Sequence, residues 1–481
     1  MKNLTMQLLL KPNWGRSACA LLLLFVTTAI ALPAQTFTTL ANFPQTDGAN
    51  PRLMSLVQGA DGNFYGTTCD LGCVGEGGAN GFGTVFKVTP TGTLTTLYSF
   101  CAQTKCTDGA FPVAGLVLGT DGNFYGTTAY GGDSDSDGTV FKITSGGTLT
   151  TLHTFDSTDG AYPYAALVQA TNGNFYGTTS YGGANGYGTV FEITSGGALT
   201  TLHSFDDTDG AYPEAALVQA TNGNFYGTTF EGGTSGDGTV FTINSGGTLT
   251  TLHSFDGADG YLPVGALVQA TNGIFYGTTL EGGTNGYGTV FKITSGGTLN
   301  TLHNFDSTDG ALPEAGLVQA TNGIFYGTTL YGGTNEACSV GCGTVFSITA
   351  GGTLTTLHNF DATDGDDPFG GLVQATNGTF YGTTYSGGAN AGGTIFSLGA
   401  GLGPFVKTLP TSGTVGAAVT ILGTNLTGAT SVTFNGTAAT FTVVSKSEIT
   451  TRVPTGATTG KVKVVTPSRT LSSNVSFRVT P

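Results

Sequence analysis

At residues 167–179 the chain reads LVQATNGNFYGTT, and close variants of this stretch recur along most of the protein. Seven copies of its Phe-Tyr-Gly-Thr-Thr core are present, and their phenylalanines are Phe64, Phe124, Phe175, Phe225, Phe275, Phe325 and Phe380. The copies follow one another at a period of about 50 residues, with several short strands in each unit. Such a period is typical of the blades of a β-propeller.

One repeat, residues 165–213, divides into four apolar runs separated by turn residues. The runs are 166–170, 174–179, 188–194 and 198–205, and each is rich in β-branched and aromatic residues, which favour strands. Asn-Gly and Gly-Gly pairs between the runs suit tight hairpin turns. Helical periodicity is missing from the sequence after the N-terminus. Each repeat therefore predicts a four-stranded antiparallel sheet.

The two ends of the repeat region complement each other. Residues 36–43 match the fourth run of a repeat and follow no first three runs, whereas the last repeat stops after its third run at 394–398. We therefore expect an all-β fold in which the N-terminal strand completes the last sheet and closes a seven-bladed β-propeller over residues 35–403. Closure would remove the exposed sheet edges that promote aggregation. The alternative is an open solenoid or a string of hairpins.

The repeat resembles the Gloeo/Verruco tandem-repeat proteins of bacteria. The resemblance rests on the run at 167–179, with Gly-Thr-Val-Phe-Lys-Ile-Thr and Thr-Leu-Thr-Thr-Leu-His downstream, and covers about residues 36 to 400. It implies a repeat fold and no particular activity. A looser similarity, through Asp-Gly-Asn-Phe-Tyr at 61–65 and 121–125, links the chain to propellers of the virginiamycin B lyase type. That family implies metal-assisted elimination, but its catalytic His and acid positions have no match here.

A different pattern begins at about Pro404, where the repeat period stops. Short strand-forming runs at 418–426, 431–437, 440–444, 449–453, 460–465 and 474–479 predict a small β-sandwich over residues 404–481. The segments 419–426, 432–436 and 453–460 are similar to the IPT/TIG family of immunoglobulin-like domains. In bacterial surface proteins that resemblance implies a spacer or an interaction module.

The N-terminus has the pattern of a secretory signal peptide, residues 1–34. Lys2, Lys11 and Arg16 precede an apolar run at 18–32, and small residues lead to an expected cleavage after Ala34. The run is short for a membrane span, and a retained anchor is the alternative. We expect a secreted, periplasmic or cell-surface protein that is monomeric and has no membrane span after cleavage. Its net charge of -15 argues against nucleic acid as a partner.

The cysteines agree with export. Cys19 lies in the signal, and the other six form three close pairs in the two longest repeats: Cys69 and Cys73, Cys101 and Cys106, Cys338 and Cys342. An even number of cysteines in an exported chain predicts disulfides. Cys69 or Cys73 could instead pair with Cys101 or Cys106, and a zinc site made by four thiolates is a further alternative.

One loop is a candidate metal site. Asp133, Asp135 and Asp137 alternate along the chain and precede Gly138, like the opening of a Ca²⁺-binding loop. Thr144 stands where an EF-hand has its bidentate Glu, and strands flank the loop, so an EF-hand is excluded. The candidates are a partial Ca²⁺ site on a hairpin tip and a solvated acidic hairpin. No other cofactor is implied.

Four sets of side chains recur with the repeats. An Asp-Gly pair before Pro predicts either a capped turn or a ring of carboxylates, and five histidines beside Leu and Phe predict packing positions. First-strand glutamines predict a polar collar around the axis, in which the side chains either bond to one another or stay free for a ligand. Aromatic residues beside the Gly-rich loops suit either carbohydrate stacking or packing. The aspartates are Asp47, Asp108, Asp159, Asp209, Asp259, Asp309 and Asp364, with the upstream partners Asp156, Asp206, Asp256, Asp306 and Asp361; the histidines are His153, His203, His253, His303 and His358; the glutamines are Gln58, Gln169, Gln219, Gln269, Gln319 and Gln374; the aromatic residues are Tyr130, Tyr181, Tyr187, Phe230, Tyr287, Tyr331 and Tyr385.

These patterns favour a binding or adhesion module for extracellular glycans or cell-surface proteins. Signatures of a nucleophile triad, a phosphate loop or a His-based metal site are missing from the sequence, so no catalytic residue is assigned. The alternatives are a lyase or glycoside-active enzyme and a purely structural envelope protein. An enzyme would need one asymmetric cleft, for which Arg52, Lys105, Glu336 and the loop at Asp133 are the unusual polar residues.

Overall fold

The computed structural model describes residues 35–44, 48–52, 55–68, 80–133, 136–335 and 337–480. In these residues the protein is all-β, and one short 3-10 turn, η2 (Thr104–Cys106), is its single helical element. No helix in these segments is long and apolar enough to cross a membrane. The predicted all-β class is confirmed.

The described part of the repeat region forms seven four-stranded antiparallel sheets. The first strands are β2 (Val57–Gln58), β6 (Val117–Leu118), β10 (Val168–Gln169), β14 (Val218–Gln219), β18 (Val268–Gln269), β22 (Val318–Gln319) and β26 (Val373–Gln374). The second strands, which carry the Phe-Tyr-Gly-Thr-Thr core, are β3 (Phe64–Thr68), β7 (Phe124–Thr128), β11 (Phe175–Thr179), β15 (Phe225–Thr229), β19 (Phe275–Thr279), β23 (Phe325–Thr329) and β27 (Phe380–Thr384). Every residue of each second strand is buried.

In the outer half of each sheet the third strand is almost wholly buried, whereas the fourth strand is mostly half-buried. The third strands are β4 (Thr84–Val88), β8 (Thr139–Ile143), β12 (Thr189–Ile193), β16 (Thr239–Ile243), β20 (Thr289–Ile293), β24 (Thr344–Ile348) and β28 (Thr394–Gly399). The fourth strands are β5 (Leu94–Ser99), β9 (Leu149–Thr154), β13 (Leu199–Ser204), β17 (Leu249–Ser254), β21 (Leu299–Asn304), β25 (Leu354–Asn359) and, from the N-terminus, β1 (Thr36–Asn42). The strand order β1-β28-β27-β26 places the first strand of the chain on the last repeat.

Hydrogen bonds and ring contacts both attach β1 to the last repeat. It pairs antiparallel with β28 from Thr36 opposite Gly399 to Asn42 opposite Thr394. The ring of Phe37 stacks on His358 with centroids 3.6 Å apart and also contacts Phe360 and Phe396. Seven residues at one end of the chain are therefore held by residues more than three hundred positions away.

Apolar clusters join each sheet to the next. In one of them, Tyr176 and Phe205 of one repeat pack with Phe225 and Phe241 of the following one. The Tyr176 and Phe225 rings stack at 4.1 Å, and the equivalent pair recurs between successive repeats. The series includes Tyr381 of the last repeat against Phe64 of the first, also at 4.1 Å. Each sheet thus packs on two others, including the first on the last.

The glycine of the repeated core is required by packing. At Gly177 a Cβ atom would lie 2.6 Å from Cζ of Phe191 and 2.8 Å from Cδ2 of Leu167, closer than real contacts permit. The aromatic and leucine side chains can fill the sheet interface only because the strand carries no side chain at this point. The other repeats have the same arrangement, for example at Gly227 and Gly327.

We predict that Gly177→Ala destabilises the protein by about 1 to 3 kcal/mol through overpacking. Gly196→Ala, in an exposed turn of the same repeat, is the matched control because the nearest atom to its Cβ would be 3.8 Å away. Denaturant unfolding of both variants measures the difference. Equal free energies of unfolding for the two variants would contradict this explanation of the repeated glycine.

The C-terminal segment folds into two further four-stranded sheets and a parallel pair of short strands. One sheet has the order β29-β31-β35-β34, the other β33-β32-β36-β37, and β30 pairs with β38. The strands are β29 (Lys407–Leu409), β30 (Ser412–Gly413), β31 (Ala418–Leu422), β32 (Ser431–Phe434), β33 (Thr437–Ala439), β34 (Phe441–Val443), β35 (Glu448–Arg452), β36 (Val462–Val465), β37 (Thr470–Ser472) and β38 (Arg478–Val479). The two sheets share one apolar core around Val432, Phe434 and Phe477.

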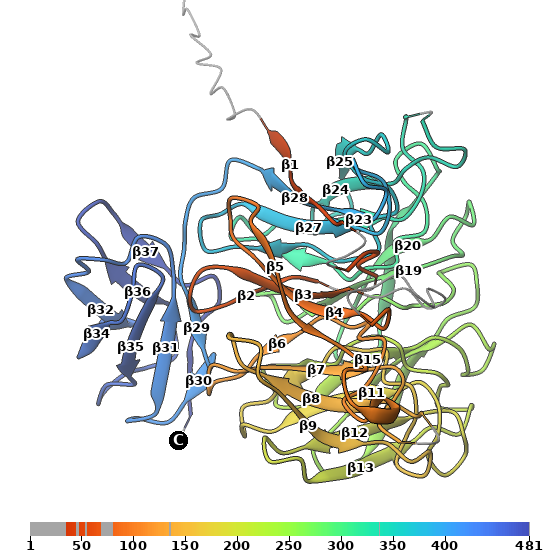
Figure 1. Ribbon diagram of the computed structural model, residues 1–481, viewed down its shortest axis with the longest axis horizontal. Helices are drawn as coiled ribbons and strands as arrows, with labels where there is room; N and C mark the ends of the chain where they lie inside the picture. Colours follow the sequence, from red (N-terminus) through yellow and green to blue (C-terminus); the bar gives the residue numbers. More distant parts are fainter. Residues whose placement is uncertain are drawn as a thin grey trace, which may run out of the picture.

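This C-terminal unit lies against one end of the repeat sheets, as Figure 1 shows for the blue strands beside β2 and β6. Ser447 donates a hydrogen bond to the carbonyl of Ala60 (2.7 Å), the hydroxyls of Thr424 and Thr376 are 2.8 Å apart, and Arg478 donates to the carbonyl of Thr221. The three partners lie in turns that join a first strand to a second strand in three different repeats. The loops between second and third strands therefore emerge at the opposite, uncovered end.

Candidate functional site

The repeats differ from one another at the residue that follows the proline before each first strand. Five residue types occupy this position, which is Arg52, Val113, Tyr164, Glu214, Val264, Glu314 and Phe369 in chain order. We call this set the post-proline ring. A position that varies within an otherwise regular repeat is where the protein can build an asymmetric site.

The backbone just before each of these prolines is strained in the same way. The residue preceding proline has a positive φ in every repeat: Asn50 (60°), Phe111 (60°), Tyr162 (54°), Tyr212 (55°), Leu262 (55°), Leu312 (55°) and Asp367 (54°). Bulky side chains rarely adopt this conformation, and such strain persists only where the surroundings hold it. At Tyr162, for example, the N–H donates to the carbonyl of Asp137 (2.9 Å) and the carbonyl accepts from Ser180 (3.1 Å). The turn therefore fixes the direction of the post-proline residue.

The post-proline segments of all seven repeats line one cavity of about 230 Å³. Its lining includes the side chains of Tyr164, Glu214, Glu314 and Phe369, while small residues such as Ala165 and Gly316 keep the walls close. At Gly316 a Cβ would lie 2.5 Å from the carbonyl oxygen of Ala266, so the segments of adjacent repeats are in direct contact. The cavity is thus a joint product of the whole repeat array.

Two carboxyl groups that line the cavity have strongly raised pKa values. Burial raises the pKa of Glu214 to about 7, although the positive charge of Arg52 opposes the shift. Burial also raises the pKa of Glu314 to about 7, again against the effect of Arg52 and with added repulsion from Glu214 and Asp367. Because desolvation outweighs the one nearby cation, both carboxyls change charge close to neutral pH.

Neighbouring groups add to this electrostatic arrangement. Burial and repulsion from Asp366 raise the pKa of Asp367 to about 6. The guanidinium of Arg52 lies 5.2 Å from the centre of the Phe369 ring. Within the described residues, Nε of Arg52 and Oδ1 of Asp366 are buried without a hydrogen-bond partner. Neither residue is among those that line the cavity.

A group of six tyrosines, which we call the tyrosine cluster, adjoins the cavity. Ring centroids are 5.0 Å apart for Tyr130 and Tyr162, 5.7 Å for Tyr162 and Tyr181, and 4.8 Å for Tyr181 and Tyr212. Burial raises the pKa of Tyr181, and the charges of Glu214 and Glu231 raise it further, so these carboxyls act on the cluster. With 42% of its surface exposed, Tyr181 presents an open aromatic face. The cluster consists of Tyr130, Tyr162, Tyr164, Tyr181, Tyr187 and Tyr212.

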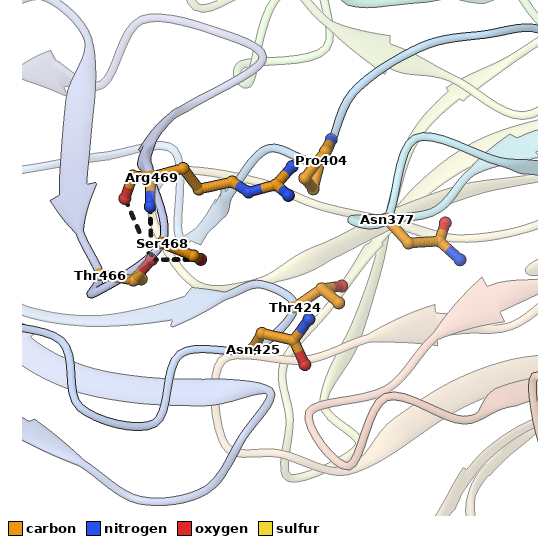
Figure 2. Close-up of a pocket in the computed structure, with 7 residues that line it drawn as sticks. All are labelled: Asn377, Pro404, Thr424, Asn425, Thr466, Ser468 and Arg469. Carbon is orange, nitrogen blue, oxygen red and sulfur yellow. Dashed lines mark hydrogen bonds between the residues drawn. The ribbon is translucent and has the colours of Figure 1, made fainter. Parts of the chain in front are cut away.

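A second cavity, of about 250 Å³, lies between the repeats and the C-terminal unit. Figure 2 shows its seven lining residues, with Arg469 extended toward Pro404 and Asn377 the one contribution from the repeat core. The hydroxyl of Thr466 is already bonded to both backbone groups of Arg469. This crevice brings together neither carboxyls nor aromatic rings, so we regard it as part of the domain contact.

The predicted calcium loop is described only in part. Asp135 lies outside the described residues, Asp133 accepts a hydrogen bond from the N–H of Ser136 (3.2 Å), and Asp137 is buried and accepts from Ser157. Calcium binding by Asp133, Asp135 and Asp137 therefore stays a prediction.

The aspartates of the Asp-Gly pairs that precede each proline cap turns and also contact the histidines. In five repeats the carboxylate accepts backbone N–H bonds and also contacts the His ring, as at His203 and Asp209 (2.7 Å). In one repeat Tyr98 replaces the histidine and its hydroxyl donates to Asp108 (2.7 Å). The histidines therefore combine the predicted packing on Phe with a hydrogen bond that the sequence reasoning missed. Asp47 lies outside the described residues.

The first-strand glutamines bond to backbone groups and not to one another. Oε1 of Gln219 accepts the N–H of Thr171 in the preceding repeat (2.9 Å), and the same bond joins Gln58 to Thr376 of the last repeat (3.0 Å). The collar is therefore a set of links between neighbouring repeats, which differs from both alternatives considered for it.

Two of the predicted cysteine pairs are disulfides, Cys101–Cys106 and Cys338–Cys342. Cys69 and Cys73 lie outside the described residues, as does Glu336. Among the residues offered for an asymmetric cleft, Arg52 lies beside the cavity, against the ring of Phe369, whereas Lys105 lies in η2. Glu214 and Glu314 were missed, and comparing the post-proline position across repeats would have found them.

The repeats match a known family over most of the chain. The model of the Gloeobacter/Verrucomicrobia repeat matches residues 26–172, 137–340 and 217–444. The chain belongs to the Gloeobacter/Verrucomicrobia repeat family. The repeat resemblance seen in the sequence is thereby confirmed, and the four-stranded sheets are the β-propeller-like form of this repeat. No curated protein matches the sequence.

Solved structures similar to this repeat protein have diverse activities. A fungal alcohol oxidase of the AA5 family, in complex with copper, is 14% identical, with a TM-score of 0.53, over 93% of this chain and 99% of the oxidase. The extracellular domain of a hybrid two component system from B. thetaiotaomicron is 12% identical over 93% of this chain and 58% of that one, with a TM-score of 0.48. A gluconolactonase from Xanthomonas campestris is 12% identical over 54% and 78%, with a TM-score of 0.37. At these identities the likeness to the oxidase concerns the fold alone.

Proposed function

We propose that this Gloeobacter/Verrucomicrobia repeat protein is an exported, monomeric binding module that recognises extracellular carbohydrate at the post-proline ring. The observation that carries the proposal is the single cavity that segments of all seven repeats line, five of them with their post-proline residue. Tyrosine and phenylalanine rings offer apolar faces for sugar stacking, and the carboxyls and Arg52 offer polar groups for hydroxyls. A cell-surface protein is the alternative ligand.

The architecture we propose for this function is a closed seven-bladed propeller. It is supported by the pairing of β1 with β28 and by the packing of Tyr381 on Phe64, which links the last repeat to the first. In such a ring the post-proline residues surround the axis at one face. The signal peptide at 1–34, if cleaved after Ala34, would leave β1 intact.

We further propose that residues 404–481 form an immunoglobulin-like domain of the IPT/TIG type that covers the opposite face. Two four-stranded sheets around one core support this assignment. Its bonds to turns of three repeats would restrict ligand entry to the uncovered face.

A glycan-array screen of the mature protein, with and without calcium, tests the binding function. We expect reproducible binding that Tyr181→Ala weakens about tenfold, because stacking on an exposed ring is lost. Tyr287→Ala is a matched control, since Tyr287 has the same 42% exposure but is not part of the tyrosine cluster. A blank array, or equal losses in the two variants, would contradict the proposed site.

The second candidate function is acid–base catalysis on a bound sugar. Glu214 and Glu314 favour it, because a carboxyl with a pKa near 7 can give and take a proton at neutral pH. The bound glycans of the same screen, incubated with the protein and assayed for new reducing ends, distinguish an enzyme from a binding module.

A further inference from the structure

We propose that the carbohydrate recognised at the post-proline ring is an amino sugar that carries free ammonium groups. This inference rests on the proposed carbohydrate-binding function and specifies its ligand class. It follows from two features of the site that a neutral sugar does not require, namely the excess of carboxyl groups and the aromatic faces beside them.

The carboxyl groups outnumber the cations at the cavity. Glu214 and Glu314 line it, Glu231 acts on Glu214, and Asp367 acts on Glu314. Arg52 is the cation that acts on this group. An acidic sugar would meet these carboxyls as well as Arg52, whereas an ammonium group would be attracted by them. The net charge of -15 extends this preference to the approach of a cationic polymer.

The tyrosine cluster provides a second, independent feature that suits an ammonium ligand. A cation is attracted to the face of an aromatic ring, most strongly where water is excluded. The exposed ring of Tyr181 is packed between Tyr162 and Tyr212 and lies within the influence of Glu214 and Glu231. Aromatic faces bordered by carboxylates form the kind of cage in which proteins hold ammonium groups.

Because the pKa values of the two glutamates are near 7, binding of an ammonium ligand should be accompanied by a measurable release of protons. An ammonium group favours the charged form of a carboxyl, so binding should expel protons from Glu214 and Glu314. The groups that face them are Arg52, Glu231 and Asp367, with the phenols of Tyr164, Tyr181 and Tyr331, which stay neutral in this range. Affinity for a ligand of fixed positive charge should therefore rise between about pH 6 and pH 8.

Isothermal titration with three oligosaccharides of one length tests the proposal. Chitosan, chitin and cello-oligosaccharides share a β-1,4-linked backbone and differ at carbon 2, which carries an ammonium, an acetamido or a hydroxyl group. We expect the ammonium form to bind at least about tenfold more tightly. Equal or tighter binding of either neutral form would overturn the ammonium inference and leave carbohydrate binding intact. Binding of none of the three would also overturn the ammonium inference, and the glycan array alone would then decide whether the protein binds another carbohydrate.

Two variants and the pH dependence of binding test whether the preference for ammonium groups arises at Glu214 and Glu314. Glu214→Gln should remove most of the advantage of chitosan over chitin, while Glu192→Gln, which removes a charge at the other end of the preceding repeat, should leave it unchanged. Titration of N,N,N-trimethyl chitosan oligosaccharides in buffers of different ionisation enthalpy should show proton release near pH 7. Proton uptake, a flat pH profile, or equal effects of the two variants would overturn the assignment to Glu214 and Glu314.

Discussion

Deletion of residues 35–42 is expected to abolish cooperative folding of the repeats, with a loss of at least about 5 kcal/mol in the free energy of unfolding. The deletion removes β1 and leaves the main-chain groups on one edge of β28 unpaired. It also uncovers apolar surface, because Phe37 packs on His358, Phe360 and Phe396. An exposed, apolar sheet edge promotes pairing with other chains, so we expect the truncated protein to aggregate.

The size of this effect follows from the closed ring that we propose for the repeats. In an open array the loss of one terminal strand would weaken one repeat and leave the others folded, since each repeat contacts only its neighbours. In a closed ring the same strand supports the contact between the first and last repeats, where Phe43 packs in one cluster with Phe64 and Tyr381. Size-exclusion chromatography and denaturant unfolding of the truncated protein measure the difference.

A peptide and a point variant make this test specific. A synthetic peptide of residues 35–44 should restore soluble, monomeric protein, because the vacant edge of β28 would accept it. Phe37→Ala should cost about 3 kcal/mol, as for other large aromatic truncations, whereas exposed Thr38→Ala should change stability little. A truncated protein that unfolds cooperatively at unchanged denaturant concentration would show that β1 does not close the repeats.

The regular parts of this fold could be predicted from the sequence because the same pattern of strands and turns recurs in each repeat. The four strands of residues 165–213, their Asn-Gly turns and the match of residues 36–43 to a fourth strand all follow from local pattern. The roles of His203 and Gln219 were harder to predict, because their partners depend on how a turn folds back and how two repeats meet.

The candidate site was less predictable for the same reason. Arg52, Glu214 and Glu314 are far apart in the sequence, and only the arrangement of the repeats brings the two glutamates to one cavity and Arg52 beside it. Their acidity depends on burial, which no single repeat reveals. Each of them does occupy the same place after a proline. The repeated proline therefore predicts where such a residue lies, and the variation in residue type at that position predicts the side chains of the site.

Replacing the two cavity glutamates, Glu214→Gln and Glu314→Gln, is expected to stabilise the protein at alkaline pH. A carboxyl with a pKa raised from 4.5 to about 7 in the folded state binds its proton more tightly there than in the unfolded chain. The stability that results is fully present below about pH 4.5 and is lost as the pH rises to about 7. Glutamine does not titrate, so a variant escapes this loss.

The gain in stability at alkaline pH should be large for two side chains that border a solvent-accessible cavity. A pKa change from 4.5 to about 7 corresponds to at most about 3 kcal/mol for each group. Both side chains border a cavity that water can enter, and solvent screening reduces the expected gain to about 1 to 2 kcal/mol each. The double variant should therefore unfold at higher temperature than the wild type at pH 8.5 and at nearly the same temperature at pH 4.5.

This outcome bears on function because it separates a binding site from a structural one. Buried carboxyls that lower stability at physiological pH are retained where activity requires them, so stabilising variants that lose ligand are the pattern expected of a functional site. Glu192→Gln is the control for charge alone, since Glu192 accepts hydrogen bonds from Asn174 and Tyr176 at the other end of its sheet. Thermal unfolding across the pH range measures all three proteins. A double variant less stable than the wild type at pH 8.5 would mean that Glu214 and Glu314 hold the fold together, and the binding site would then have to lie elsewhere.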